Sequence, residues 1–376
     1  MAKHMTRRER LMAIFEGRIP DRPAVRVWGL DFYWDLIHPA FGPIREKAFA
    51  ITDVITESKA PFDLFCGVHS LKLTKTWEEK TASSEWVDEI TTIQTPKGVL
   101  RQVYQKSTLN KPGYHKEHFV KDAADVEKLL SLPYEAFPCT ADDYLRDTAK
   151  MGDDGIVIQG IDNPAFGLHR LMGSETIAYL SVDNRDLLMA LAGRFARRVR
   201  EHVNQVLATG IRPVFGWVGP EIAIPPLMSV NDFEEIVFQN DKNTIDVIHN
   251  AGCRLWVHCH GDMSPVLERF ADMGVDVLNP IEPPPTGRIT LEQAFARVGN
   301  RMGLEGNIEV HDVMTLSREA LGKKIEEAVR AGAGKRYILG MCSGYMEDPF
   351  PTPRLIENLM FFVEEGVRLA EACRRG

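Results

Sequence analysis

The chain has 376 residues, of which 44% are hydrophobic and 26% charged, and its net charge is −8. This composition is typical of a soluble globular protein, and the acidic balance offers no basic surface for nucleic acid. No stretch approaches the ~20 apolar residues of a membrane span, and the six cysteines are scattered without paired spacings. We therefore expect a cytoplasmic protein with reduced thiols that binds neither nucleic acid nor membranes.

The first part of the chain mixes helices and strands. Thr6 and Glu9 form a capping box, which predicts a short helix that Gly17 ends. After the turn at Pro20 to Pro23 we expect a strand over residues 24–28, a helix over 42–58 and a second strand over 62–66. Residues 71–118 then alternate like half-exposed strands around the turn Pro96-Lys97-Gly98, which indicates an inserted β-hairpin segment.

From Asp122 onward, strands and helices alternate regularly. The apolar runs that predict further strands, each followed by a helical stretch, lie at residues 155–160, 212–218, 254–260, 275–280, 301–306 and 336–340. Counted from Ala24 this gives eight strands, and a βα repeat of that number predicts a (β/α)8 TIM barrel of the α/β class. We expect one barrel domain over residues 1–376, since no G-x-G-x-x-G motif indicates a dinucleotide-binding sheet.

The barrel places the residues that follow each strand at one end, where barrel enzymes have their sites. His258 and His260 share one face of a strand, about 6.5–7 Å apart, whereas Cys259 points to the other face and is expected to pack against helices. Histidine, carboxylate and thiol together are a zinc-type ligand set, although each residue alone has a structural reading as a turn, cap or core residue. The polar residues that follow the third to eighth strands are Asp162, Asn163, Glu221, His258, His260, Glu282, Glu305, Asn307 and Cys342.

Several motifs together resemble the uroporphyrinogen decarboxylase superfamily. They are Thr6 to Leu11 with Pro20 to Pro23, the end of the strand at His258 to Gly261, Leu304 to Ile308, and Tyr337 to Gly340 leading to Pro351-Thr352-Pro353. The resemblance runs nearly end to end. It implies a single-domain barrel that is either a decarboxylase or a zinc-dependent methyltransferase acting on methyl-corrinoid proteins.

The resemblance favours the methyltransferase branch. The decarboxylase grips its polycarboxylate substrate with an arginine-rich segment, but the corresponding stretch, Val25 to Asp31, keeps one arginine and gains an aspartate. The methyltransferases hold zinc with His-x-Cys and a cysteine after the last strand. Here His258 matches the histidine, His260 stands in the place of the first cysteine and Cys342 matches the last.

Histidine in place of a thiolate leaves a more Lewis-acidic metal, which favours ether cleavage over activation of a thiol. We therefore expect a zinc-dependent, corrinoid-linked methyltransferase that demethylates a methoxylated aromatic or another small methyl donor, with the corrinoid on a partner protein or as free cobalamin. Zinc would be held by His258, His260 and Cys342. Glu221 is the expected fourth ligand or acid, with Glu282 and Glu305 as further catalytic candidates.

The expected substrate-binding residues are Trp28, Asp162, Asn163, Asn307 and Tyr345. The alternatives are a metal-free decarboxylase-like lyase, in which Arg26, Asp63 and Tyr345 would matter more, and a methylcobamide:thiol methyltransferase of the coenzyme M type. A barrel that only binds a small ligand or a corrinoid protein is a third. The sequence leaves the oligomeric state open.

Overall fold

A computed structural model describes residues 4–33, 35–344 and 346–374. Its main sheet has eight parallel strands in the order β1-β12-β11-β10-β9-β8-β7-β2. The backbone N–H of Asp53, just before β2, donates to Val25 O of β1 at 2.7 Å, so the two ends of this order meet and the sheet closes. The predicted α/β barrel is therefore confirmed. The strands are β1 (Ala24–Val25), β2 (Val54–Lys59), β7 (Gly155–Gly160), β8 (Val214–Val218), β9 (Arg254–His258), β10 (Val277–Asn279), β11 (Gly303–Ile308) and β12 (Tyr337–Met341).

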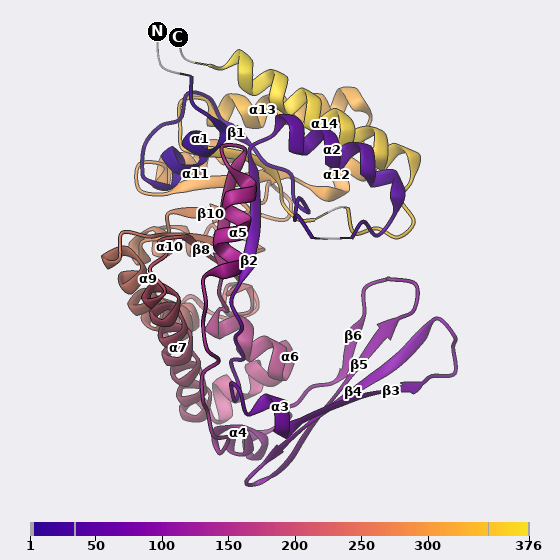
Figure 1. The fold of residues 1–376 in the computed structure, drawn as a ribbon, viewed down its shortest axis with the longest axis vertical. Coiled ribbons are helices and arrows are strands. Elements are labelled where there is room, and N and C mark those ends of the chain that lie inside the picture. The colour runs from indigo at the N-terminus through magenta and orange to yellow at the C-terminus, as the bar shows by residue number, and fades with distance from the viewer. Residues whose placement is uncertain (1–3, 34, 345, 375–376) are drawn as a thin grey trace.

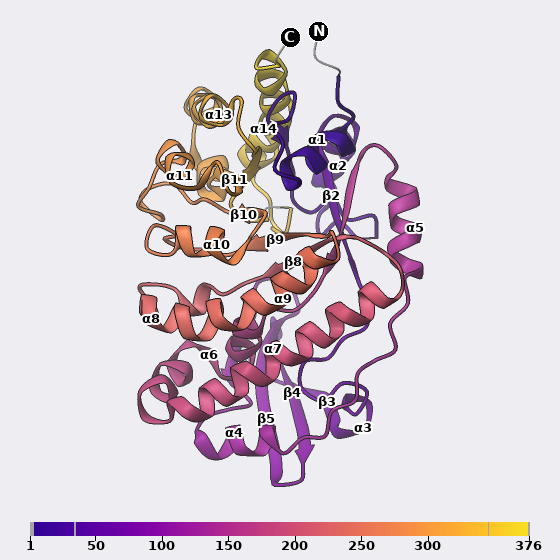
Figure 2. The same ribbon diagram turned by 90° about the vertical axis from the view of Figure 1, so that its left-hand side faces the viewer.

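Helices follow the strands and surround the sheet, with both chain ends on the same side of the molecule (Figures 1 and 2). The longer ones are α1 (Arg7–Phe15), α2 (Gly42–Ile51), α5 (Asp142–Met151), α6 (Pro164–Asp183), α7 (Arg185–Ala208), α9 (Gln239–Asn250), α13 (Arg318–Gly332) and α14 (Pro353–Ala372). Shorter helices are α3 (Ser70–Leu73), α4 (Ala123–Leu130), α8 (Val230–Asp232), α10 (Leu267–Met273), α11 (Leu291–Val298) and α12 (Val310–Thr315), with 3-10 turns at Pro39–Phe41 and Glu221–Ala223 and a π-helical turn at Phe233–Phe238. Across the part of the chain described above, no helix is both long and apolar enough to cross a membrane.

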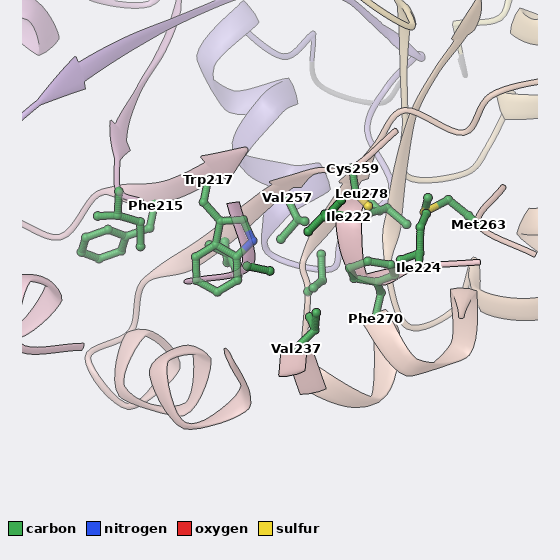
Figure 3. Close-up of a cluster of buried hydrophobic side chains, with 14 of the residues drawn as sticks. Phe215, Trp217, Ile222, Ile224, Val237, Val257, Cys259, Met263, Phe270 and Leu278 are labelled. Carbon is green, nitrogen blue, oxygen red and sulfur yellow. The ribbon is translucent and has the colours of Figure 1, made fainter. Parts of the chain in front are cut away.

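The outward face of the central strands is covered by apolar helix side chains. Figure 3 shows Val257 of β9 and Cys259 just after it in a cluster that includes Val237 and Phe270. Cys259 is fully buried there. Because side chains alternate along a strand, the same register turns Trp256 and His258 toward the inside of the barrel.

The bottom of the barrel is filled by α1. Its capping box at Thr6 and Glu9 is present as predicted. Leu11, Ile14 and Phe15 of this helix join the inner strand residues, among them Ile158 and Trp256, in one buried apolar cluster. The barrel is therefore packed from below, and its polar inner residues lie toward the C-terminal ends of the strands.

One strand lies elsewhere than predicted. Residues 42–58, expected to be one helix, divide into α2 and β2, and residues 62–66, expected to be the second strand, form no strand. The β-branched run Val54-Ile55-Thr56 favours an extended chain over a helix. In the loop that follows, the Oδ1 atom of Asp63 accepts hydrogen bonds from three successive backbone N–H groups, which holds a turn.

The insertion is larger than a hairpin. It is a four-stranded antiparallel sheet of β3 (Thr74–Lys80), β4 (Trp86–Thr95), β5 (Gly98–Ser107) and β6 (Tyr114–Glu117), which projects away from the barrel (Figure 1). The predicted turn joins β4 to β5. One face of this sheet is anchored, since Ile93 and Leu100 are buried in the same apolar cluster as residues of the barrel.

A buried ion network joins the start of β2 to β1 and α1. The carboxylate of Asp53, fully buried, accepts from Arg10 Nη1 at 2.6 Å, from Arg22 Nη1 at 3.0 Å and from Val25 N at 2.8 Å. Arg10 also donates to Asp21. The network explains why the motif around Arg10 and the Pro20 to Pro23 turn occur together in this sequence.

Replacement of Asp53 by asparagine should destabilise the fold by about 3 kcal/mol or more, since it leaves two buried guanidinium groups without their shared counter-charge. Urea unfolding followed by circular dichroism measures this change. Asp154→Asn is the matched control, because Asp154 pairs with Arg7 of the same helix but its side chain is 63% exposed. Equal losses of stability in both variants would contradict a role for Asp53 in closing the barrel.

Candidate active site

The two histidines of the strand end face each other inside the barrel mouth. His258 is the last residue of β9 and His260 follows two residues later. Their ring centroids are 4.4 Å apart and the ring planes are nearly perpendicular, at 88°. The two imidazoles therefore lie on the same side of the chain at the end of β9, as predicted.

His258 is held in its neutral form. Its Nδ1 lies 2.6 Å from Oδ1 of Asn279, the residue opposite it on β10. Because that oxygen can only accept, the ring proton lies on Nδ1 and the lone pair on Nε2. Burial lowers the pKa of His258 to about 3, and the charges on His260 and Arg26 act in the same direction.

His260 has the opposite electrostatic surroundings. Its Nδ1 lies 2.8 Å from Oε1 of Glu282, whose other oxygen accepts from the backbone N–H of Gly261 at 2.8 Å. The hydrogen bond to Glu282 raises the pKa of His260, although burial opposes it, and the charges of Glu221 and Glu309 add to the increase. Among the described residues, no hydrogen bond engages Nε2 of His258 or His260, so both atoms are available to a ligand.

Two further carboxyl groups and a thiol follow other strands at the same end of the barrel. Glu221 begins the 3-10 turn after β8, its Oε2 is buried without a hydrogen-bond partner, and burial raises its pKa, with the charge of Glu282 adding to the effect. Burial also raises the pKa of Glu309, whose Oε1 is likewise buried without a partner. Cys342, after β12, is 1% exposed, and burial raises its pKa well above the ordinary value, as do the charges of Glu309 and Glu282.

The three predicted zinc ligands do not form an assembled metal site. Over residues 4–33, 35–344 and 346–374, no group of three or more His, Cys, Asp or Glu side chains is arranged to hold a metal ion. Cys342 follows β12, which lies three places along the sheet from β9. The two imidazoles on their own fit a metal, because each Nδ1 is fixed by an oxygen acceptor and each Nε2 is open.

Glu305 organises the floor of the mouth. It is fully buried, and its two oxygens accept from Arg26 Nη1 at 2.9 Å and from Trp256 Nε1 at 2.7 Å. The Arg26 guanidinium also lies 4.3 Å from the ring centroid of Trp28. With both oxygens occupied, Glu305 positions Arg26 and Trp256, and a catalytic role for Glu305 itself, as predicted from the sequence, has less support.

Above this floor lies a cavity of about 400 Å³, here called the mouth cavity. Its lining includes Arg26, Trp28, Glu57 and Trp256, so it reaches the tryptophans that contact His258. Gly216 also lines the cavity and allows close packing there, since a Cβ on it would lie 2.5 Å from Ile158 and 3.3 Å from Trp256.

Not all of the predicted substrate-binding residues reach the mouth cavity. Trp28 lines it, whereas Asp162 does not and stands 3.8 Å from Arg170. Asn163 caps α6 through its Oδ1 and donates from Nδ2 to Asp241 at 2.8 Å, which is a structural role. Asn307 lines a separate cavity of about 230 Å³ beside α11 and α13. Tyr345 lies outside the described residues.

The sequence did not single out Asn279, Glu309 or Glu57. Asn279 ends a predicted strand, and the parallel register that sets it opposite His258 was the available signal. Glu309 is the first residue after β11, two residues beyond Asn307, which was the last candidate predicted for this strand end. Glu57 was hidden because its strand was predicted as helix.

Comparison with known proteins places this site in a family. The family model described as uroporphyrinogen decarboxylase (URO-D) matches residues 110–365. A uroporphyrinogen decarboxylase of Prochlorococcus marinus (strain MIT 9313) is 23% identical over 261 residues, which cover 64% of this chain and 70% of the relative. One of Synechococcus sp. (strain CC9605) is 20% identical over 239 residues, covering 60% and 64%. A solved structure described as a methyltransferase from Methanosarcina mazei matches with a TM-score of 0.60 and 14% identity, covers 96% of this chain and 98% of its own, and supports the fold.

The pair Asn163 and Asp241 predicts a pH dependence of stability. Burial raises the pKa of Asp241 to about 7, so between its ordinary value near 4 and 7 the unfolded chain ionises while the folded chain keeps the proton. Stability should therefore decline as the pH rises through this window and level off above it. Asp241→Asn should remove the decline and be the more stable protein at pH 8 by a few kcal/mol, measured by urea unfolding at a series of pH values. A wild-type protein whose stability rises from pH 5 to 8 in parallel with that of the variant would contradict this assignment.

Proposed function

The chain belongs to the uroporphyrinogen decarboxylase family, as its motifs predicted, and within that family we propose that it is a zinc-dependent methyltransferase that passes a methyl group to a corrinoid. One observation carries the proposal: at the C-terminal end of β9 the buried His258 and the half-buried His260 have their Nδ1 atoms fixed and their Nε2 atoms open. This is the arrangement that orients histidines toward a metal.

The residues around the histidines would prepare them for that role. Burial keeps His258 neutral, Asn279 accepts from its Nδ1 and so leaves the lone pair on Nε2, and Glu282 fixes the ring of His260. His258 and His260 would hold the zinc, with the Cys342 thiolate as the proposed third ligand, and binding would release the protons of Cys342 and His260. The metal would supply Lewis acidity at the oxygen of a methyl donor.

Glu221 is the proposed acid. Cleavage of a methyl ether breaks the bond between the methyl carbon and oxygen, so the methyl group leaves for the reduced corrinoid and the oxygen needs a proton. Burial keeps the Glu221 carboxyl protonated to higher pH than usual. Glu221 follows β8, the neighbour of β9 in the sheet. Glu221 would donate its proton to the departing oxygen.

A methoxylated aromatic is the proposed donor, and a corrinoid on a partner protein, or free cobalamin, is the proposed acceptor. The mouth cavity, which adjoins His258 through Trp28 and Trp256, has apolar and aromatic walls suited to a single ring. The cavity volume of about 400 Å³ lies at the small end of the range for ligand pockets.

A decarboxylase-like lyase is the second candidate, and the names of the curated relatives favour it. A polycarboxylate substrate needs several cations, however. Arg26 is the one Lys or Arg side chain that lines the mouth cavity among the described residues, and Glu305 already neutralises it. For this reason we place methyl transfer first.

The metal proposal predicts about one zinc per chain in protein purified with zinc. His258→Ala and His260→Ala should each lose most of the metal, because each removes an imidazole nitrogen, and Cys342→Ala should bind it more weakly. Cys259→Ala is the control, since that thiol faces the helices. Elemental analysis by mass spectrometry measures the content, and equal zinc in all four variants would refute the ligand assignment.

The reaction itself is tested with the corrinoid spectrum as readout. Protein incubated with cob(I)alamin and 2-methoxyphenol should form methylcob(III)alamin. Glu221→Gln should slow the reaction about 10²-fold, because the amide has no proton to give. Glu319→Gln, with a side chain that is 82% exposed, should leave the rate unchanged. A second assay follows methyl transfer from methylcob(III)alamin to thiols, and activity in that assay alone would show that the proposed direction of transfer is wrong. If zinc-loaded protein is inactive in both assays, the proposal is refuted.

A further inference from the structure

The mouth cavity has an unusual balance of charge. Three carboxylates, of Asp31, Glu57 and Glu347, belong to its lining. Arg26 is the one cation of the lining within the described residues, and its charge is matched by Glu305 at 2.9 Å. Lys59 lies 3.3 Å from Glu57, but its side chain is 70% exposed and stands outside the lining. Burial raises the pKa of Glu57, although the charge of Lys59 opposes the increase. Together with Asp31 and Glu347, it gives a ligand in this cavity a net negative surrounding.

The same cavity has buried donors without acceptors. Arg26 is 6% exposed, and its guanidinium carries five N–H groups, yet Glu305 is its one hydrogen-bond acceptor among the described residues. Its Nε and the Nε1 of Trp28 are both buried without a partner. Because buried donors are normally satisfied, these two would gain an acceptor if a ligand oxygen reached them.

These two features select the chemistry of the ligand. A hydroxyl or ether oxygen can accept from Arg26 or Trp28 without adding negative charge, and a hydroxyl can also donate to a carboxylate such as Glu57. A ligand carboxylate would satisfy the same donors but would face three like charges at short range in a partly enclosed space. The apolar walls, which include Ile55 and Ile158, complete a site for an aromatic ring.

We propose that the mouth cavity selects an uncharged, hydroxylated or methoxylated aromatic and rejects the same ring when it carries a carboxylate. The inference rests on the proposed function for the role of this ring as methyl donor. It narrows the donor to methoxyphenols, as opposed to methoxybenzoates, and assigns the discrimination to Asp31 and Glu57.

Isothermal titration calorimetry on the purified full-length protein tests the selection without turnover. The probes are 2-methoxyphenol, which is uncharged at pH 7, 4-hydroxy-3-methoxybenzoate, which adds one carboxylate, and the trimethylphenylammonium cation. At an ionic strength of about 0.15 M, the phenol should bind at least tenfold more tightly than the benzoate. The double variant Asp31→Asn with Glu57→Gln should reduce that ratio severalfold, mainly by strengthening benzoate binding.

Glu364→Gln is the matched control, since it removes one negative charge from a side chain that is 53% exposed on α14 and should leave the ratio unchanged. Trp28→Phe keeps an aromatic ring but removes the indole donor, so it should weaken the phenol severalfold. If the ratio of phenol to benzoate affinity falls in the control as well as in the double variant, the selection is a long-range effect of net charge. That result would overturn its assignment to Asp31 and Glu57.

The inference falls if the benzoate binds as tightly as the phenol, if the ammonium cation binds most tightly, or if none of the probes binds. Failure of the methyl-transfer proposal looks different. Selective phenol binding without methyl transfer to cob(I)alamin would leave the selection standing and remove the reaction. Turnover of methoxybenzoates alone would keep the reaction and overturn the selection.

Discussion

The buried carboxylate of Asp53 holds β1 and β2 together at the point where the barrel closes. β1 has only two residues in its ladder with β12, so it contributes few backbone hydrogen bonds to the closure. Asp53 makes up for this with the bond from Val25 N and with ion pairs to Arg10 and Arg22. Arg26, the next residue after β1, reaches Glu305 of β11 past the intervening strand β12. The short strand β1 therefore joins the Asp53 ion network at one end to the floor of the candidate site at the other.

The two histidines show how neighbouring side chains can give one residue type two protonation states. Burial lowers the pKa of His258 to about 3, with the charges of His260 and Arg26 adding to the decrease and the hydrogen bond to Asn279 opposing it. His260 faces the carboxylate of Glu282, and its pKa rises. Two titratable groups whose surroundings separate their pKa values are a feature of catalytic sites. His258 is therefore a ready nitrogen ligand, whereas the raised pKa of His260 lets a proton compete with a metal at its Nε2.

Much of this arrangement could be predicted from the sequence, because the period of a strand fixes which side chains share a face. The alternation in 254–260 was enough to set His258 and His260 inside and Cys259 outside, and the repeat of strands and helices was enough to predict the barrel. What sequence reasoning missed depends on partners far apart in the chain. Asn279 acquires its role only from the register of β10 against β9, and Asn163 bonds to Asp241, 78 residues away.

The error in the predicted position of the second strand had a larger consequence, because residues of β2 line the mouth cavity. Only Thr52 and Asp53 separate the helix from the short β-branched run, so the helix and the strand were predicted as one segment, and Glu57 was lost with it. Asp31, by contrast, was visible as a new carboxylate in the stretch after β1, where it already argued against a polycarboxylate substrate. Asp31 shares the lining of the mouth cavity with Glu57 and Glu347, so the structure adds two more carboxyl groups to that argument. The chain keeps the barrel of this family. The charge at the mouth of the barrel, however, is negative, whereas a substrate with many carboxylates requires positive charge.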